Sequence, residues 1–298
     1  MKPFVSILII TYNQIDFISE TLRSALEQDY ENLEVVVADD GSADGTADVI
    51  LEFSEKYPER LIPLVGGPNL GITGNSNRAL KACRGEYIAF QGGDDLFLPG
   101  KISAQVEFME NHPEYALSYH NIDVFDSASG NSLWLWFDRY KKRVGDAGAI
   151  IKYGTFMGAT SVVMRRSMCP DLYFDERIKI SSDWLFWIEA LARSGNKIGV
   201  IDKVYAKYRR HDSNVTLNNC HKFLDMMDTL YIVRNKYPQL LSQCEDRCAV
   251  VCLLEIKRLF FSKKMSDIKL ILPFLFKCSP GLFFALNVAF RRLLRLKI

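Results

Sequence analysis

The first 112 residues alternate between short apolar runs and amphipathic segments, and this alternation limits the folds open to the chain. Four runs have the composition of buried strands, and each is followed by a segment with helical spacing of its apolar residues. The predicted strands are Phe4–Ile10, Leu33–Ala38, Leu61–Val65 and Tyr87–Gln91. The predicted helices are Asp16–Glu27, Thr46–Lys56, Thr73–Ala82 and Pro99–Asn111. Strands and helices that alternate with short connections predict an α/β fold, in which a parallel sheet carries helices on its faces.

The rest of the chain has a different organisation. Residues 113–218 mix loops with a predicted helix at Asp183–Ser194 and short predicted strands. These strands are Tyr115–Tyr119, Ser161–Met164 and Val204–Tyr208. From about His221 the pattern is helical. We therefore expect one domain over residues 1–218, divided into an N-terminal section (1–112) and a second section (113–218), and a helical C-terminal region over residues 219–298.

Charge and cysteine content narrow the class of protein. The 37 basic and 36 acidic residues nearly cancel, so no overall charge favours binding to nucleic acid. Seven irregularly spaced cysteines argue against a disulfide framework and fit a reducing cytoplasm. Cys244, Cys248 and Cys252 recur every four residues, which is compatible with a metal cluster or with an apolar helix stripe. We favour the stripe, because no histidine or CxxC pair lies beside them. No signal-peptide pattern precedes the first strand, so we expect a cytoplasmic protein.

The segment Leu270–Phe290 is very apolar, but Lys277, Pro280 and Gly281 interrupt it, and four basic residues follow by Lys297. A charge and helix breakers in the middle make it a poor membrane-spanning helix. A helix that lies on an anionic membrane surface and a helical hairpin that packs on the domain both remain open. We expect the peripheral membrane contact.

Polar and acidic residues follow each of the four predicted N-terminal strands. They are Thr11, Tyr12 and Asn13; Asp39, Asp40, Gly41 and Ser42; the segment 66–71; and Gly92, Gly93, Asp94 and Asp95. Ligands of parallel sheets bind beyond the carboxyl ends of the strands, so these residues should converge. Two acidic pairs in one crevice require a cation, and Mg²⁺ or Mn²⁺ suits oxygen ligands and also binds substrate phosphates. The pattern predicts a nucleotide diphosphate ligand. The motifs GxGxxG, GxxxxGK[ST] and GxSxG are absent from these positions.

Two longer runs carry a family resemblance. VSILIITYNQIDFISETLRSALEQDYENLEVVVADDGSADGT and NLGITGNSNRALKACRGEYIAFQGGDDLFLPGK resemble the start and the donor-side block of the inverting GT-A glycosyltransferases of family 2, a large family with many bacterial polysaccharide enzymes. The resemblance extends over residues 3–215. It implies a GT-A fold, Rossmann-like with a mostly parallel sheet, followed by the helical extension. It also implies a metal-dependent transfer of sugar from a nucleotide diphosphate, most often a UDP-sugar, to a glycan or lipid-linked acceptor.

The resemblance also implies roles for individual residues. Thr11, Tyr12 and Asp39 would contact the nucleotide base, with Asn13 beside them. Asp40, Gly41 and Ser42 would shape the donor pocket, and Gly71, Asn75, Arg78 and Asp95 would belong to the same donor-binding set. Asp94 would bind the metal, and His211, in the segment YRRHDSNVT, would approach the metal or the pyrophosphate. Residues 1–112 would then bind the nucleotide and residues 113–218 the acceptor. The enzyme would act at the inner face of the cell membrane, in polysaccharide biosynthesis.

Asp183 matches the catalytic base of the family, near the start of the helix DWLFWIEAL. As a base it would accept the proton of the attacking hydroxyl. Taken alone, an aspartate at this position is more often a helix cap, and the upstream blocks reverse this preference in favour of catalysis. Because a helix N-terminus lowers the pKa of a carboxylate, we expect Asp183 to have a lowered pKa and to be ionised at neutral pH.

Other residues keep two interpretations. Arg209 and Arg210 fit a solvated face or a phosphate clamp, and the segment Gly154–Ser161 fits an acceptor loop or a linker. The tryptophans fit sugar stacking or, more commonly, core packing. They are Trp134, Trp136, Trp184 and Trp187.

Two other functions compete with transfer: a non-catalytic scaffold that binds sugar nucleotides, and a sugar nucleotidyltransferase. The presence of Asp183 after the acceptor region argues against the scaffold. A nucleotidyltransferase would need a basic, glycine-rich triphosphate loop near the N-terminus, and the sequence has none there.

Overall fold

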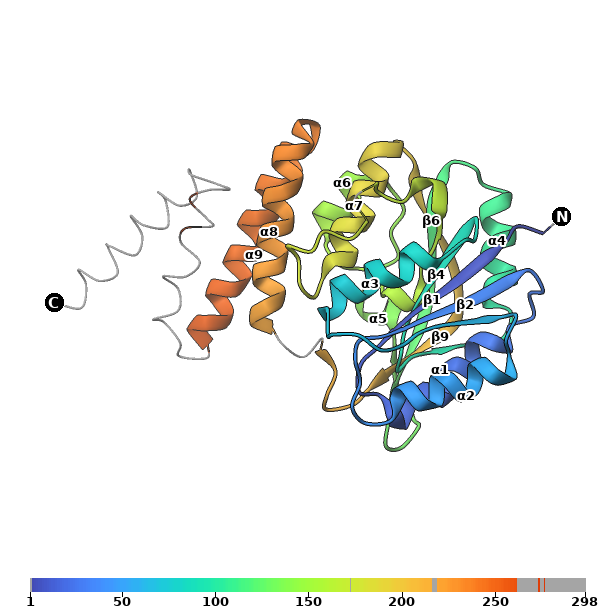
Figure 1. Cartoon of the computed structure of the whole chain (residues 1–298). Helices are drawn as coiled ribbons and strands as arrows, with labels where there is room; N and C mark the ends of the chain where they lie inside the picture. Colours follow the sequence, from blue (N-terminus) through green and yellow to red (C-terminus); the bar gives the residue numbers. More distant parts are fainter. Residues whose placement is uncertain (1, 172, 216–218, 262–272, 274–275, 277–298) are drawn as a thin grey trace.

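The computed structural model describes residues 2–171, 173–215, 219–261, 273 and 276 (Figure 1). Within these residues the strands are β1 (Val5–Thr11), β2 (Leu33–Asp39), β3 (Leu61–Leu64), β4 (Tyr87–Gly92), β5 (Leu96–Phe97), β6 (Tyr115–Asp126), β7 (Ser132–Leu135), β8 (Val163–Arg165) and β9 (Lys197–Arg210). The helices are α1 (Ile15–Leu26), α2 (Thr46–Lys56), α3 (Gly71–Ala82), α4 (Lys101–Glu110), α5 (Trp136–Arg139), α6 (Ala147–Tyr153), α7 (Ser182–Ser194), α8 (Asn219–Lys236) and α9 (Leu241–Phe261). The strands form one sheet in the order β3-β2-β1-β4-β8-β6-β9-β5, and β7 pairs with β6.

The N-terminal half of the sheet is parallel, as the alternation of strands and helices predicts. Strand β1 lies between β2 and β4, with Val5 opposite Leu33 on one side and Tyr87 on the other. Strand β2 is buried along its whole length, which explains the apolar run from Val35 to Ala38. Helices α1, α2 and α4 share one hydrophobic core on one face of the sheet, and α3, α6 and α7 share a second core on the other face. Helices therefore lie on both faces.

The other half of the sheet makes the whole sheet mixed. Strand β8 is antiparallel to β4 and β6, β9 runs parallel to β6, and β5 is antiparallel to β9. Strands β6 and β9 are both longer than the sequence predicts. In β6, the polar residues Ser118, His120 and Asn121 are buried, so the apolar pattern is interrupted in the middle of the strand. Strands β5 and β7 and helices α5 and α6 are not predicted from the sequence, because they are too short to show a period.

Helices α8 and α9 pack beside α6 and α7 and are not separate from the domain (Figure 1). Leu230 and Val233 of α8 belong to the same core as Trp184 and Trp187 of α7. The cysteine stripe of α9 lies in this core as well: Cys244, Cys248 and Cys252 are all buried, and none of the three forms a disulfide. The prediction of an apolar stripe is therefore confirmed.

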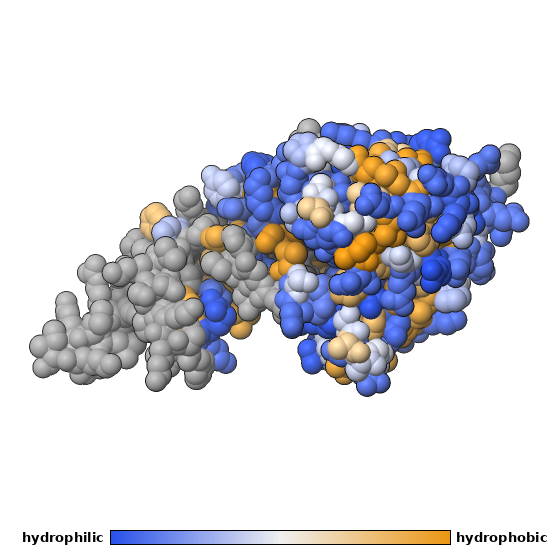
Figure 2. Space-filling model, turned by 60° about the horizontal axis from the view of Figure 1, so that its bottom comes forward, coloured by the Kyte–Doolittle hydropathy of each residue, from blue (hydrophilic) through white to orange (hydrophobic). Residues whose placement is uncertain are grey.

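The surface is mainly hydrophilic, with separate hydrophobic patches on the face that Figure 2 shows. Across the described part of the chain, no helix is both long and apolar enough to cross a membrane. The segment 270–290, for which we expect a membrane contact, lies outside the described residues apart from positions 273 and 276.

Candidate active site

The loops that follow β1, β2, β3 and β4 lie side by side at the carboxyl edge of the parallel half of the sheet. The Asp40 N–H donates to the Thr11 carbonyl oxygen over 3.0 Å, and the Gly93 N–H donates to the Ile10 carbonyl oxygen over 2.9 Å. The loop after β3 joins them through the Leu70 N–H, which donates to Asp40 Oδ1 over 2.7 Å. The structure therefore brings together the four loops that the sequence places at one edge.

The loop after β2 forms a compact turn around Asp39, which is 1% exposed. The Ser42 N–H donates to Asp39 Oδ2 over 3.0 Å, and the Ser42 hydroxyl donates to the other carboxylate oxygen. The Asn13 N–H in turn donates to Ser42 Oγ over 2.7 Å, which links this turn to the end of β1. Between them, Tyr12 is half exposed. At this edge the exposed ring of Tyr12 therefore lies next to a hydrogen-bonded polar turn, formed by Asp39 and Ser42.

Backbone conformation explains two glycines of the predicted set. Gly41 has a φ of +78°, and a Cβ there would lie 3.0 Å from the Gly67 carbonyl oxygen. Gly71, with a φ of +74°, begins α3. Both values lie in the left-handed region that other residues rarely adopt. At these two positions a larger residue would strain the loops that face the carboxyl edge.

Side chains of helix α3 form hydrogen bonds with the backbone at the carboxyl edge of the sheet. Asn75 Nδ2 donates to the Ala38 carbonyl oxygen over 2.8 Å, while its buried Oδ1 has no hydrogen-bond partner among the described residues. The Arg78 guanidinium donates to the carbonyl oxygens of Asp39 and Val65, over 3.1 and 3.2 Å. Both side chains of the predicted set thus hold the ends of β2 and β3 in this structure.

Asp94 and His211 face each other across the edge. His211 Nε2 lies 2.9 Å from Asp94 Oδ2, and Asn214 Nδ2 lies 3.3 Å from the same oxygen. Asp95 turns inward: it is 4% exposed, and its Oδ1 accepts the Arg209 N–H over 3.1 Å. Burial, together with the neighbouring charge of Asp94, raises the pKa of Asp95 well above its ordinary value. Of the two adjacent carboxylates, only Asp94 is placed to meet a ligand directly.

Arg209 is buried rather than part of a solvated face, so that interpretation is wrong for this residue. Its Nε donates to the Asp94 carbonyl oxygen over 2.7 Å, and it forms a salt bridge with Glu20. The guanidinium lies over the rings of Phe17 and Phe125, at 4.9 and 4.7 Å from their centroids. Arg209 therefore fixes the turn that presents Asp94. No sequence pattern indicates this role, because it depends on a contact between β9 and the end of β4.

The arrangement fits a divalent cation that is shared with a substrate. Among the described residues, no group of three or more His, Cys, Asp or Glu side chains is arranged as a metal site. The protein offers instead one oxygen and one nitrogen ligand side by side, on Asp94 and His211. Mg²⁺ and similar ions are held by one or two protein carboxylates when substrate phosphates supply the remaining ligands. The residues present therefore fit a cation that arrives with a diphosphate.

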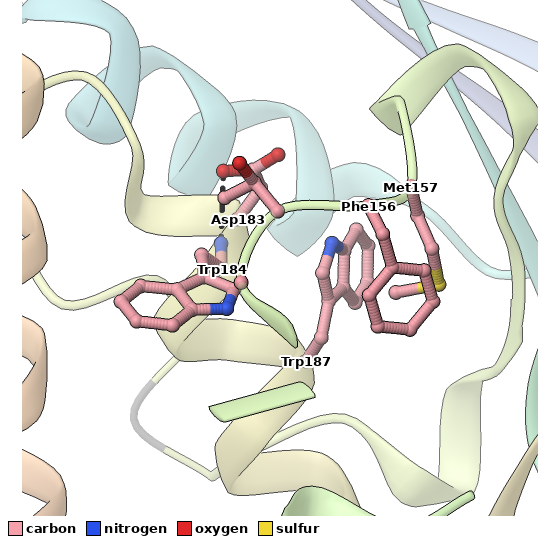
Figure 3. Close-up of a pocket in the computed structure, with 7 residues that line it drawn as sticks. Phe156, Met157, Asp183, Trp184 and Trp187 are labelled. Carbon is pink, nitrogen blue, oxygen red and sulfur yellow. Dashed lines mark hydrogen bonds between the residues drawn. The ribbon is translucent and has the colours of Figure 1, made fainter. Parts of the chain in front are cut away.

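Asp183 lies in the first turn of α7 and lines a small pocket (Figure 3). The other walls come from Thr155, Phe156 and Met157 of the segment after α6, and from Trp184 and Trp187. The Trp184 N–H donates to Asp183 Oδ1 over 2.8 Å, which fixes the carboxylate. Asp183 as a whole residue is of intermediate burial. One carboxylate between aromatic walls is a suitable acceptor for a proton from a bound hydroxyl group.

The prediction that the pKa of Asp183 is lowered is wrong. Burial raises the pKa of Asp183 to about 6, and the charge of Asp225 adds to the rise. The N–H of Trp184 opposes the shift, but this hydrogen bond does not compensate for the lost hydration. With a pKa near 6 the carboxyl group is still mostly ionised at pH 7, and its basicity is closer to that of a general base at neutral pH.

Two elements hold the segment that leads into α7. Thr73 Oγ1 of α3 donates to the Ile178 carbonyl oxygen over 2.5 Å. Asp225 of α8 accepts the N–H groups of Ile180 and Ser181, both over 2.8 Å. Asp225 is 6% exposed, so this contact is shielded from water. Sequence patterns did not single out Asp225, because a buried aspartate in a helix resembles any other polar helix residue.

The tryptophans divide into two groups. Trp184 and Trp187 are each 2% exposed and belong to the core, as core packing predicts. Trp134 and Trp136 are only partly buried.

The fold and the edge loops define a class of protein. The TarS structure from S. aureus (residues 1–349) in complex with UDP-GlcNAc is similar to this chain, with a TM-score of 0.60 and 20% identity over 90% of each chain. The mannosyltransferase PcManGT from Pyrobaculum calidifontis, in complex with GDP-Man and Mn²⁺, has a TM-score of 0.63 and 16% identity, over 98% of this chain and 81% of that one. At these identities the likeness shows the fold alone, and that fold is GT-A.

Sequence comparison then places the chain in a family. The model of glycosyl transferase family 2 matches residues 6–168. The glucosyltransferase WfaP of Escherichia coli, named for transfer from UDP-Glc to α-D-GlcNAc-diphosphoundecaprenol, is 30% identical over 76% of this chain and 85% of its own length. An uncharacterized protein of Mycobacterium tuberculosis is 32% identical over 70% of this chain, which spans 59% of that relative. The chain belongs to glycosyl transferase family 2.

Proposed function

We propose that the protein is a metal-dependent, inverting hexosyltransferase that moves a sugar from a nucleotide diphosphate to a glycan or lipid-linked acceptor in cell-surface polysaccharide synthesis. One observation carries the proposal: Asp183 lines a pocket at the start of α7. A second set of acidic groups, Asp39 and Asp94, lies at the ends of β2 and β4. A base and a site for a charged donor are the two components that such a transfer requires.

The donor site rests on the carboxyl-edge loops. Tyr12 is exposed beside the Asp39 turn, which supports contact with a nucleotide base. UDP-sugars are the preferred donors in this proposal, because WfaP is named for UDP-Glc and the TarS structure contains UDP-GlcNAc. Asp94 and His211 would hold the divalent cation, Mg²⁺ or Mn²⁺, which would neutralise charge on the diphosphate. Arg209 and Asn214 keep these two side chains in place.

The acceptor site rests on Asp183. In the proposed reaction its carboxylate accepts the proton of an acceptor hydroxyl while the acceptor oxygen forms a bond to the anomeric carbon. The bond from that carbon to the diphosphate breaks, and its electron pair leaves with the nucleoside diphosphate. A single displacement on the face opposite to the leaving group inverts the anomeric centre. The raised pKa of Asp183, about 6, makes the carboxylate a better proton acceptor than an exposed aspartate.

The substitution Asp183→Asn tests the assignment. We expect it to abolish sugar transfer and to leave Mn²⁺-dependent binding of nucleotide sugars unchanged, because the amide preserves the shape but not the proton acceptor. A thermal-shift panel of nucleotide sugars, with and without Mn²⁺, identifies the donor, since ligands that bind the native state raise its melting temperature. If the Asp183→Asn variant still transferred sugar at the wild-type rate, Asp183 would not be the base. If wild-type protein bound sugar nucleotides but transferred nothing, the scaffold alternative would replace our proposal.

We further propose that the C-terminal region contacts the inner face of the cell membrane, where lipid-linked acceptors reside. The support is the sequence alone: an apolar stretch at 270–290 followed by basic residues. Deletion of residues 265–298 should move the protein from the membrane fraction to the soluble fraction. An unchanged distribution would refute the membrane contact without affecting the assignment of the active site.

A further inference from the structure

Four aromatic side chains form a cluster on the surface beside the candidate acceptor pocket. The aromatic cluster consists of Trp134, Trp136, Tyr140 and Tyr208, from β7, α5, the residue after α5, and β9. The centroids of the Trp134 and Trp136 rings are 5.6 Å apart, and those of Trp136 and Tyr140 are 4.6 Å apart, both with nearly parallel planes. The rings of Tyr208 and Trp136 make an edge-to-face contact, with their centroids 6.1 Å apart. This arrangement is unusual at a surface, because stacked aromatic rings are normally buried in a core.

The cluster remains open to solvent. Tyr140 is 39% exposed, and Trp134 and Trp136 are only partly buried. The Arg139 guanidinium lies over the Trp134 ring, 4.1 Å from its centroid, and is itself exposed, so it covers part of one ring face and adds hydrogen-bond donors there. Flat apolar ring faces with polar groups at their edges match a pyranose ring, which has C–H groups on its faces and hydroxyl groups around its rim. Binding sites of this type combine aromatic walls with a few polar groups.

The cluster is joined to the pocket of Asp183 by a direct contact. Trp136 Nε1 donates to the Phe156 carbonyl oxygen over 2.8 Å. A Cβ on Gly158 would lie 3.7 Å from the Trp136 ring, so the indole packs along the segment 156–158. Phe156 and Met157 of this same segment form the wall of the pocket that contains Asp183. A glycan that reaches Asp183 with one sugar would therefore have the aromatic cluster beside it for another.

We infer that the aromatic cluster is a binding subsite for a pyranose unit of the acceptor glycan, adjacent to the sugar that presents its hydroxyl to Asp183. The inference rests on the proposed transferase function and deepens it. It assigns acceptor binding to Trp134 and Trp136, which lie outside the donor loops. Trp136 has the additional role of fixing the pocket wall through Phe156.

Fluorine NMR on 5-fluorotryptophan-labelled protein tests the inference directly. The chain has four tryptophans, and single Trp→Phe variants assign their signals. The probes are methyl glucoside, methyl N-acetylglucosaminide, maltotriose and chitotriose, each titrated to about 50 mM because single-subsite binding is in the millimolar range. We expect at least one probe to shift the signals of Trp134 and Trp136 in a saturable way. The signals of the buried Trp184 and Trp187 should move less. If no probe shifts Trp134 or Trp136, the inference is wrong.

A matched pair of variants on β7 separates stacking from a general effect on the strand. Trp134→Ala should weaken probe binding, read at the Trp136 signal, by about fivefold or more, because a stacking face is lost. Leu133→Ala removes an exposed apolar residue from the same strand, 52% exposed, and should leave binding unchanged. Equal loss in both variants would overturn the inference. Titration of the same labelled sample with UDP-sugars and Mn²⁺ tests the transferase proposal separately. Donor binding without any probe shift would refute only the acceptor subsite.

Discussion

Replacing Asp225 with alanine should destabilise the protein strongly and impair the candidate base at the same time. The Asp225 carboxylate accepts three backbone N–H groups from the segment before α7, those of Lys179, Ile180 and Ser181, over 3.3, 2.8 and 2.8 Å. Asp183 follows this segment by two residues. Helix α8 therefore fixes the position from which α7 begins, and we expect Asp225 to act on Asp183 through the backbone.

The magnitude follows from these contacts. A hydrogen bond to a charged group contributes about 1.5–3 kcal/mol, and the longest of the three contributes least. Alanine leaves three donors without their acceptor at a site that is almost closed to water, since Asp225 is 6% exposed. We expect Asp225→Ala to lower the free energy of unfolding by about 3–5 kcal/mol. Asp225→Asn retains one acceptor oxygen and should cost about 1–3 kcal/mol.

Urea denaturation measures the stability, and Asp228→Ala is the control. Asp228 lies on the same helix, carries the same charge and is exposed, so its removal should change stability by less than about 1 kcal/mol. In Asp225→Asn, which keeps more of the fold, kcat should fall while donor binding is preserved. The pKa of Asp183 should also decrease, because a neighbouring negative charge is lost. If Asp225→Ala and Asp228→Ala lost equal stability, or if the Asp225→Asn variant kept wild-type kcat and pH dependence, the argument would be refuted.

Two further predictions concern pH. First, kcat/KM for transfer should fall about tenfold per pH unit below pH 6. The reason is that burial raises the pKa of Asp183 to about 6, and only the ionised carboxylate accepts a proton. A fall in kcat/KM centred near pH 4 would contradict this prediction. Second, burial and the charge of Lys101 hold the pKa of His120 in the folded protein well below its ordinary value. As pH falls below about 6.5 the unfolded chain gains a proton that the native state excludes, so this residue should lower stability by up to about 1.4 kcal/mol per pH unit. His120→Phe keeps an aromatic ring that can pack against Tyr205. It should reduce the slope of the free energy of unfolding against pH between pH 6.5 and 5, measured by denaturation. An unchanged slope would assign the acid sensitivity to other groups.

The parallel half of the fold is predictable from sequence because its central strands β1, β2 and β4 are buried on both faces. Strand β2 is apolar from Val35 to Ala38, and helix α1 has a regular apolar face, so both appear as local patterns. The mixed half is harder to predict because it depends on pairing between distant segments. Strand β6 buries His120 and Asn121, and its partner β9 contains the exposed residues Asp202 and Lys203, so neither shows a clean period.

The candidate site shows the same division. The strand-end position of Asp39 and Asp94 follows from topology, since the ends of parallel strands meet at one edge. The pKa of Asp183 does not, because a local rule about helix N-termini omits the aromatic walls around it. The role of Arg209 is not predictable from sequence either, because its contact with Asp94 joins residues that are 115 positions apart. Sequence patterns therefore locate carboxylates on elements, while their protonation depends on packing that only the structure supplies.

Helices α8 and α9 are integral to the candidate active site and are not an appendage to it. The segment before α7 is held on one side by α3, where Asn77 Nδ2 donates to the Phe174 carbonyl oxygen over 2.9 Å, and on the other side by Asp225 of α8. One support comes from the proposed donor-binding section and the other from beyond residue 218, so Asp183 depends on both. The boundary at 218 separates sequence patterns, but α8 and α9 share their hydrophobic core with α6 and α7. A chain that ended there would lose the acceptor of three backbone N–H groups and a wall of that core. The folded unit that positions Asp183 therefore has to include α8 and α9.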